Sequence, residues 1–511
     1  MKEFYDVVIL GGGPAGAVTA SFLAKEGHKV ILLESMKFPR QHIGESLLAV
    51  SMPYLYELGL KDILKENYIK KLGTYFCWGK EMFLGMPEPG YAYQVRRATF
   101  DSMLLKHCCD LGVKVVEEAK LTDTFFEDGK ILGVQYKNKN NFYEVRCNHF
   151  VDASGQSKFL TRKLSLNITH NGPKRSALSA YFINVKKEPD PHAGDTITEA
   201  TLDGWMWYIP LDNDETSIGF VGDEIDTKKL NTNEFFMKQL NGTEKIKKLV
   251  EGATMSTSPN VINYFNYIVE DKLWNKNYTI VGDAGFFVDP LFSTGVHGAV
   301  YSGYLAAKGI SAVLKEEYKN EEVSLWYDKE IRQHYNRIQQ TVNLLYGIGP
   351  GNTPFWKTRS VKDIALDNAQ ELVRGLGIQG ANLFKDGMQD DSFNLPINIK
   401  CHLDEVFNPS KSKEIKLDSK SRLMLADNIK TEIGLAIHKG RLDKCLNISH
   451  VNNYTYKFSF PVKSFLAKTM LKIDGSNTVQ ELIEQLNDKN KSKQLFNFIQ
   501  FIAKYGVLQK Q

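Results

Sequence analysis

The chain has 511 residues, 42% of them hydrophobic and 24% charged, and a formal net charge of +4. This length and composition are ordinary for a globular protein with two or three domains. The net charge is small and basic residues are interleaved with acidic ones, so a nucleic-acid-binding protein is not expected.

The cysteines and the apolar segments indicate the compartment. The six cysteines show no CxxC spacing, which argues against a metal site or a redox dithiol and for a reducing compartment, with the cytoplasm as the default. The apolar stretch of residues 7–24 is broken by a glycine-rich turn, which is not typical of a signal peptide. Asp283 and Asp289 interrupt the other apolar candidate, so we expect no membrane span.

The chain opens with a dinucleotide-binding pattern. A short β-branched apolar run, a glycine-rich turn and a helical segment together span residues 5–26. In this GxGxxG pattern, Gly11 makes the tight turn and Gly13 lets the backbone approach a pyrophosphate. Gly16 allows the helix to pack closely on the strand, and Ala15 lies beside it at the helix N-terminus, where phosphates bind.

Three further strands are predicted in the same sheet. One ends at Glu34, at the distance from the glycines from which a carboxylate takes the ribose hydroxyls. The others cover residues 150–155 and 278–284, and the last contains Gly282 and Asp283. The fold class is therefore α/β, with a doubly wound, Rossmann-like nucleotide domain. Three segments are expected to form it, about 1–110, 145–160 and 275–345.

A second sheet is predicted on the substrate side. Residues from about 160 to 270 alternate apolar and polar in short runs, which predicts a mostly antiparallel sheet, joined by residues from about 70 to 100. Within it, Trp205 and Trp207 point the same way, because side chains alternate along a strand, and form one flat aromatic wall. Pro210 then ends the strand. Taken alone, such a pair is more typical of a packed core than of a functional site.

A helix is predicted to begin near Gly295, where small residues start to recur at helical spacing. The amides of Thr294 and Gly295 would have no partner within that helix, and such an N-terminus attracts an anion. A long helical segment from about residue 316 to 345 closes the core. The remainder, 346–511, is predicted to be mostly helical, and a lid, a dimer surface and a partner-docking module are all open for it.

The segments after the strand that ends at Glu34 resemble the FAD-binding half of the flavoprotein monooxygenase superfamily. Arg40 and Glu45 lie directly after that strand, and Arg97 follows further along the chain. The resemblance implies that FAD is the dinucleotide, that Arg40 and Arg97 approach it, and that Asp283 meets its ribityl chain and pyrophosphate. Glu45 and Gly282 are counted among the cofactor-binding residues on the same ground.

Over residues 5–345 the chain resembles the flavin-dependent halogenases. Their signature, Trp-x-Trp-x-Ile-Pro, stands here as Trp205, Trp207, Ile209 and Pro210. Residues 70–79 look like the segment that bears the family's active-site lysine. Lys71 is the match, and Lys70 is the competing choice.

Phe292 indicates a branch of this family. The tryptophan halogenases place a glutamate just before their Ser-Thr-Gly, where this chain has Phe292. A carboxylate there would serve as a base or stabilise the cation formed from an unactivated indole position, whereas a phenolate or pyrrole needs less help. The resemblance therefore implies a small aromatic substrate of the phenol or pyrrole type, free or tethered to a carrier protein.

The resemblance also implies a mechanism. Reduced FAD, oxygen and chloride or bromide would give hypohalous acid, with the halide held by the amides of Thr294 and Gly295. Lys71 would hydrogen-bond this acid or carry it as a chloramine, while Trp205 and Trp207 keep the flavin apart from the substrate. No second nucleotide motif is present, so we expect a separate reductase to supply the reduced flavin.

Three other functions share part of the pattern. A single-component aromatic hydroxylase and a saturating reductase of the geranylgeranyl type have the same flavin half. The paired tryptophans and Lys71 favour the halogenase over both. A non-catalytic FAD-binding module would hold FAD but never consume oxygen after reduction.

Overall fold

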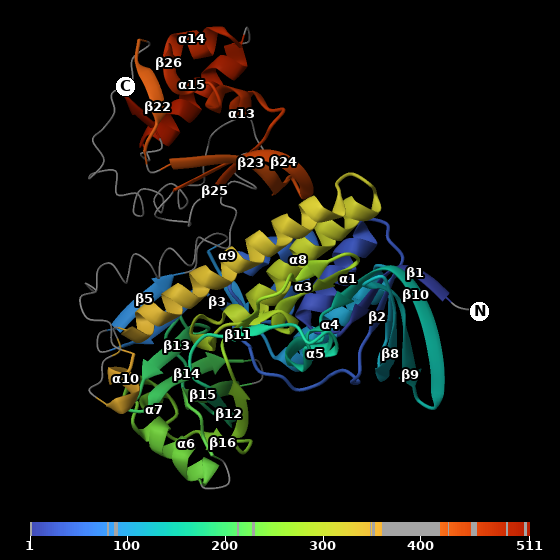
Figure 1. Ribbon diagram of the computed structural model, residues 1–511. Coiled ribbons are helices and arrows are strands. Elements are labelled where there is room, and N and C mark those ends of the chain that lie inside the picture. The colour runs from blue at the N-terminus through green and yellow to red at the C-terminus, as the bar shows by residue number, and fades with distance from the viewer. Residues whose placement is uncertain are drawn as a thin grey trace. The chain divides into compact units, whose positions relative to one another are not determined.

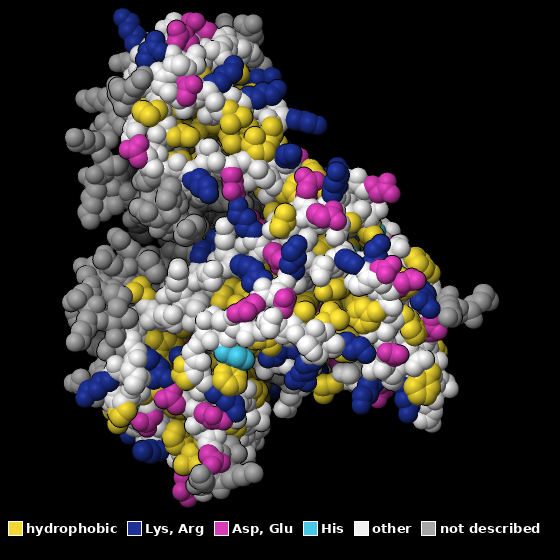
Figure 2. Space-filling model, viewed as in Figure 1, with side chains coloured by type: hydrophobic (Ala, Val, Ile, Leu, Met, Phe, Trp, Pro, Cys, Tyr) yellow, Lys and Arg dark blue, Asp and Glu magenta, His cyan; other side chains and the backbone are white. Residues whose placement is uncertain are grey.

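The computed structural model describes residues 3–78, 81–85, 90–211, 214–226, 230–347, 349, 353–359, 420–427, 429–450, 457–486, 489–504 and 508–510. The chain divides into two compact units, Met1–Arg374 and Gly375–Gln511. On the face shown in Figure 2, basic and acidic side chains are interleaved over the surface of the first unit.

A largely parallel sheet forms the core of the first unit (Figure 1). Its strands are β1 (Glu3–Leu10), β2 (Val30–Leu33), β7 (Lys114–Val116), β8 (Ala119–Glu127), β9 (Lys130–Asn138), β10 (Asn141–Asp152), β19 (Trp274–Asn275) and β20 (Tyr278–Ile280). The order is β19-β20-β10-β1-β2-β7, and β8 and β9 extend β10 as an antiparallel meander. Because β1 pairs in parallel with both β10 and β2, and β10 with β20, the predicted nucleotide sheet is confirmed.

Small residues let the helices approach this sheet closely. Helix α1 (Pro14–Lys25) contacts both α4 (Arg97–Asp110) and α8 (Thr294–Leu314). A Cβ atom at Gly16 would overlap the carbonyl oxygen of Gly11, and one at Gly303 in α8 would lie 2.7 Å from the carbonyl oxygen of Ala15. These glycines therefore fix how near α1 lies to β1 and to α8.

The second sheet of this unit is the predicted substrate-side sheet. Its strands are β4 (Gly73–Cys77), β5 (Glu81–Gly85), β12 (Arg175–Ile183), β13 (Thr196–Ala200), β14 (Gly204–Pro210), β15 (Glu215–Asp223), β16 (Thr254–Met255) and β17 (Asn260–Tyr264). The order is β16-β12-β15-β14-β13-β4-β5, with β17 also on β12. Only the pairing of β13 with β4 is parallel among these strands, so the mostly antiparallel sheet is confirmed.

Short elements connect the two sheets. They are η1 (Ala49–Ser51), α2 (Met52–Glu57), α3 (Lys61–Asn67), β3 (Ile69–Lys71), β6 (Ala92–Gln94), η2 (Gly155–Ser157), α5 (Phe159–Lys163), β11 (Ile168–His170), α6 (Thr232–Asn241), α7 (Lys245–Leu249), β18 (Tyr267–Val269), η3 (Gly282–Ala284), β21 (Phe286–Phe287) and η4 (Pro290–Phe292). β3 pairs with β6, and β11, β18 and β21 form a small sheet. Phe236 of α6 and Ile246 of α7 belong to the apolar core that covers one face of the substrate-side sheet.

The first unit continues past the boundary predicted at residue 345. Helix α9 (Asn320–Gly347) runs along α8 (Figure 1) and is the predicted long helix. The indole of Trp356, in α10 (Pro354–Lys357), donates to the Thr201 carbonyl at 2.7 Å, and the Thr353 hydroxyl donates to the Leu202 carbonyl at 2.6 Å. Because these contacts tie α10 to the loop before β14, the boundary lies later than expected.

The second unit corrects the prediction of a mostly helical C-terminal region. Its strands are β22 (Arg422–Leu425), β23 (Ile429–His438), β24 (Arg441–His450), β25 (Lys457–Pro461), β26 (Asp474–Thr478) and β27 (Leu508–Lys510), with helices α13 (Phe465–Met470), α14 (Val479–Glu484) and α15 (Lys489–Lys504). Lys439 and Gly440 both have positive φ and join β23 to β24, which is the geometry of a two-residue hairpin turn. The predicted capping box of Thr478 and Glu481 is confirmed at the start of α14.

No helix among the residues that the structure describes is long and apolar enough to cross a membrane. The described cysteines, Cys77, Cys108, Cys109, Cys147 and Cys445, form no disulfide with one another, while Cys401 lies outside the described residues.

We expect Gly16→Ala to destabilise the protein by about 1–3 kcal/mol, because the added methyl group would overlap Gly11 and push α1 off the sheet. Gly13→Ala is the matched control, since the nearest atom to its Cβ is 3.5 Å away on Arg40. Urea unfolding without added flavin measures both. Equal stability of Gly16→Ala and the wild type would contradict the close packing described above.

Candidate functional site

The carboxyl ends of β1 and β2 form a nucleotide cradle. The Glu34 carboxylate, almost fully buried, accepts the backbone amides of Gly12 and Met36, each at 2.7 Å. The N-cap of α1 is Gly13, and no side chain caps this helix start. The chain thus provides backbone amides for a pyrophosphate and a fixed carboxylate for a ribose, so these residues fit a dinucleotide such as FAD.

The charges of Arg97 and Asp283 act on each other. The Arg97 guanidinium forms two hydrogen bonds with Asp101, at 2.8 and 2.9 Å, and donates to the Ile43 carbonyl at 2.8 Å. Arg40 lies 3.6 Å from the same Asp101 carboxylate. Burial raises the pKa of Asp283 to about 6, against the opposing effect of the Arg97 charge.

The two remaining cofactor candidates, Gly282 and Glu45, contact different elements. Gly282 donates its amide to the Ser302 hydroxyl of α8 at 2.9 Å, so η3 is fixed to that helix. Glu45 is placed against the substrate-side sheet instead of the glycine-rich turn, since its buried carboxylate accepts the Tyr181 hydroxyl at 2.6 Å. Burial raises the pKa of Glu45, while the Ser217 hydroxyl bonds its charged form.

The structure separates the two candidate lysines at the end of β3. Side chains alternate along a strand, so Lys70 and Lys71 point to opposite faces. Lys70 is exposed, with its ammonium 4.5 Å from the centre of the Tyr91 ring, whereas Lys71 is 0% exposed. The Lys71 Nζ donates to the Ser46 hydroxyl at 2.6 Å.

A row of polar side chains supports Ser46. Its hydroxyl lies 2.9 Å from that of Thr196, and the Thr196 hydroxyl accepts from the Gln94 amide at 2.9 Å. The Asp195 carboxylate is engaged by the backbone amides of Leu72 and Gly73, at 2.7 and 2.8 Å.

Burial lowers the pKa of Lys71 to about 7, and the negative charge of Asp195 opposes that effect. No ion pair of Lys71 is found within the described ranges. A buried amine without a counterion can therefore gain or lose its proton near neutral pH.

The aromatic wall is present but is not flat. Trp205 and Trp207 are 2% and 8% exposed, and their ring centres are 6.2 Å apart, but the ring planes are tilted by 55°. The tilt follows from their different hydrogen bonds, because the Trp205 indole donates to the Tyr346 hydroxyl at 2.7 Å and the Trp207 indole to Ser217 at 3.2 Å. Trp207 also covers Gly219, where any Cβ would overlap its ring.

The remaining residues of the wall end this strand. Ile209 and Pro210 are buried, and Pro210 is the last residue of β14, as predicted. All of β14 is buried, so the wall is part of the protein's interior on both faces.

The predicted anion site is the start of α8. The helix begins at Thr294 and is preceded by Ser293, which has a left-handed conformation with φ of 56° and makes no side-chain capping bond. The first amides, including that of Gly295, therefore have no intrahelical or side-chain cap. Just before them, Phe292 is buried with its ring 5.7 Å from that of Phe76.

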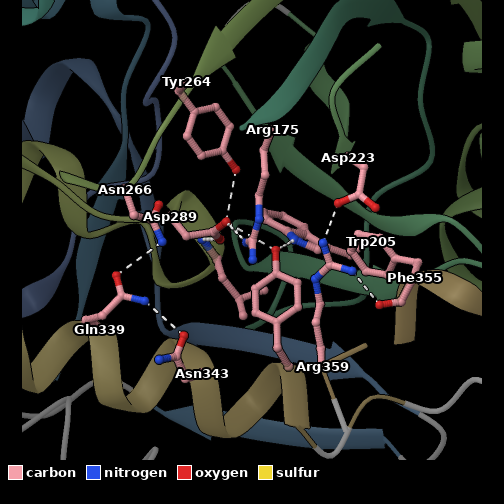
Figure 3. A network of polar contacts seen from close by, with 12 residues as sticks. Arg175, Trp205, Asp223, Tyr264, Asn266, Asp289, Gln339, Asn343, Phe355 and Arg359 are labelled. Carbon is pink, nitrogen blue, oxygen red and sulfur yellow. Dashed lines mark hydrogen bonds and ion pairs between the residues drawn. The ribbon is translucent and has the colours of Figure 1, made fainter. Parts of the chain in front are cut away.

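Sequence reasoning missed the buried network that supports this segment (Figure 3). Asp289, at the N-cap of η4, is paired with Arg175 and accepts the hydroxyls of Tyr264 and Tyr346. These residues come from segments far apart in the chain, and in the sequence Asp289 only interrupts an apolar stretch. No metal-binding group of three or more His, Cys, Asp or Glu is found in the part of the chain that the structure describes.

The chain is similar in sequence to known proteins. The sequence model of the family described as Tryptophan halogenase matches residues 6–88 and 80–389. The chain is 30% identical over 405 residues to the flavin-dependent halogenase otaD of Aspergillus carbonarius, covering 73% of this chain and 81% of that protein. It is 28% identical over 378 residues to the 1H-pyrrole-2-carbonyl-(peptidyl-carrier protein) chlorinase of Pseudomonas fluorescens, covering 67% and 83%.

The fold is also that of a solved structure. The myxobacterial chondrochloren halogenase CndH, described as a new variant of FAD-dependent halogenases, matches with a TM-score of 0.67 at 31% identity. The match covers 79% of this chain and 97% of that one.

We expect Lys71→Met to stabilise the protein at pH 7. The folded pKa of about 7 lies below the usual 10.5, so the unfolded chain binds this proton more tightly and stability falls as the pH drops from 10.5 to 7. Removing the amine should raise the Tm by roughly 2–5 °C at pH 7, with a smaller gain near pH 10. Thermal unfolding at the two pH values, with Lys70→Met as the exposed control, measures this. A lower Tm for Lys71→Met than for the wild type at pH 7 would show that the buried amine does not destabilise the folded protein.

Proposed function

Because the chain belongs to the tryptophan halogenase family of flavin-dependent halogenases, which use FAD, we propose that it halogenates a phenol or a pyrrole with chloride or bromide. The observation that supports this proposal is that the two buried indoles donate hydrogen bonds to different acceptors, which lead toward two chemically different segments. Trp205 is linked through Tyr346 and Asp289 to the loop before α8. Trp207 bonds Ser217, which also bonds Glu45, the neighbour of the Ser46 that holds Lys71.

The first site holds the halide. When bound, reduced FAD would supply two electrons and two protons, with which oxygen, a halide ion and one further proton would become hypohalous acid and water. The amides of Thr294 and Gly295 bind the halide, because a helix start carries a partial positive charge and these donors lack other partners. Trp205 and Trp207 keep the organic substrate away from the flavin. The hypohalous acid is therefore the species that travels from the halide site to Lys71.

The second site is Lys71, which guides the hypohalous acid to the substrate. In its protonated form, the ammonium donates a hydrogen bond to the oxygen of the acid and so stabilises the hydroxide that leaves when the ring takes the halogen. In its neutral form, the amine attacks the halogen, the oxygen–halogen bond breaks, and water departs with the proton of the amine. A pKa near 7 makes both forms accessible at neutral pH.

The substrate is proposed from the residue beside the halide loop. Phe292, packed on Phe76, provides no carboxylate to assist an unactivated ring position, so an electron-rich ring is favoured. The pyrrole chlorinase relative acts on a pyrrole carried by a peptidyl-carrier protein. We therefore propose a phenol or pyrrole, free or tethered to a carrier protein, with a separate reductase as the source of reduced flavin.

We expect Lys71→Ala to keep the rate of flavin reoxidation but to form at least about 100-fold less halogenated product, because the step that it serves follows the formation of hypohalous acid. The enzyme is given reduced FAD, oxygen, bromide or chloride and a panel of phenols and pyrroles, and product is measured by mass. Lys70→Ala, which changes the exposed neighbour, should resemble the wild type. Normal product from Lys71→Ala would exclude this role.

We expect Gly295→Pro to raise the halide concentration needed for half-maximal product by about tenfold or more, since proline removes one amide donor while fitting the first turn of a helix. Gly295→Ala is the control, because it keeps the amide and the nearest atom to its Cβ is 3.9 Å away on Phe287. An unchanged halide requirement in Gly295→Pro would mean that the halide binds elsewhere.

A further inference from the structure

One buried carboxylate lies between the two functional segments of the first unit. Asp289 is 0% exposed, and Figure 3 shows Arg175 and Tyr264 pointing toward it from the substrate-side sheet. One carboxylate oxygen pairs with Arg175 and accepts the hydroxyls of Tyr264, at 2.9 Å, and Tyr346, at 3.2 Å. The other oxygen accepts the amide of Leu291 at 3.1 Å.

Two partners of Asp289 keep their ordinary charge states in this network. Burial and the Asp289 charge raise the pKa of the Tyr264 hydroxyl well above its ordinary range. Burial lowers the pKa of Arg175, but Tyr346 and Asp289 raise it by more, so the net pKa is raised. The Arg175 guanidinium also lies 4.3 Å from the centre of the Tyr346 ring. A buried ion pair is costly to desolvate unless its other hydrogen bonds are satisfied, and here both tyrosines supply them.

The two oxygens of the Asp289 carboxylate bond residues of different elements. Through Leu291 it caps η4, which continues into Ser293 and the first amides of α8. Through Tyr346 it reaches the wall, because the hydroxyl that donates to Asp289 also accepts the indole N–H of Trp205. The tilt of Trp205 and the start of α8 are therefore set by the same group.

We propose that Asp289 is a positioning residue that fixes the halide-binding start of α8 and the indole of Trp205 relative to each other, through Leu291 on one side and Tyr346 on the other. This inference rests on the proposed function, since it assumes that the halide binds at the start of α8. Its consequence is that halide affinity and the yield of halogenated product depend on a network that touches neither halide nor substrate.

The Tyr346 branch is tested by Tyr346→Phe, which keeps the ring and removes only the hydroxyl. We expect the yield of halogenated product per FAD reoxidised to fall at least fivefold, while FAD affinity and the reoxidation rate stay within twofold of the wild type. Tyr335→Phe is the matched control, because Tyr335 lies on the same helix, α9, and its hydroxyl accepts one bond from Asn171 outside the network. An unchanged yield in Tyr346→Phe would overturn the proposal.

The Leu291 branch is tested by Asp289→Asn, whose single carbonyl oxygen cannot cap η4 and also serve Arg175 and both tyrosines. The charged Arg175 competes for that oxygen, so the amide of Leu291 loses its acceptor. We expect the Kd of bromide, measured by titrating the flavin absorption spectrum of the oxidised holoenzyme, to rise at least fivefold. Because this readout needs no turnover, it also separates the two claims. If Gly295→Pro weakens bromide binding and Asp289→Asn does not, the positioning role is wrong and the proposed halide site stands. If Gly295→Pro leaves bromide binding unchanged, the halide site is wrong and the positioning role falls with it. If Asp289→Asn does not fold, Tyr346→Phe decides the proposal alone.

Discussion

The burial of β14 along its whole length is the constraint on which the site depends. A buried indole N–H needs a hydrogen-bond acceptor inside the protein, and Trp205 and Trp207 find theirs in different directions. One acceptor, Tyr346, belongs to the last turn of α9 and leads toward the start of α8. The other, Ser217, belongs to β15 and leads toward the loop that supports Lys71. The hydrogen bonds that allow Trp205 and Trp207 to be buried thus also connect them toward the start of α8 and toward the segment that supports Lys71.

The two proposed sites, the start of α8 and Lys71, differ in electrostatic character. The start of α8 offers uncapped amides and no side-chain cation among its first described residues, which suits a weakly held anion. Lys71 is a buried amine whose pKa is lowered by burial more than the Asp195 charge raises it, which makes its proton easier to lose. A halide ion is negatively charged, which suits the amides at the start of α8. Hypohalous acid is neutral, which suits an amine that can be neutral itself. The proposed function therefore assigns an anion to the start of α8 and a neutral oxidant to Lys71.

Local patterns in the sequence predicted most of the fold. The spacing of Gly11, Gly13 and Gly16 and the carboxylate of Glu34 depend on one strand–turn–helix–strand unit, so they could be read directly. Lys71 could be preferred over Lys70 only by resemblance, because alternation along β3 puts one of them inside without saying which. The C-terminal strands were missed because their signal, a Lys-Gly turn between two alternating runs, is weak without the positive φ values that the structure provides.

Contacts between distant segments could not be predicted in this way. Trp205 and Trp207 share a face, as alternation requires, yet their planes are tilted because Tyr346 and Ser217 come from other elements. Asp289 reads in sequence as one acidic residue in an apolar stretch, and its partners are known only once three segments fold against it.

The most direct test of this account is the position of a bound halide. A crystal of the FAD-bound protein soaked in bromide should show an anomalous peak within hydrogen-bond distance of the amides of Thr294 and Gly295, on the opposite side of Trp205 and Trp207 from Lys71. A bromide peak at Lys71 with none at the start of α8 would contradict the separation of the two sites on which this account of the chemistry rests.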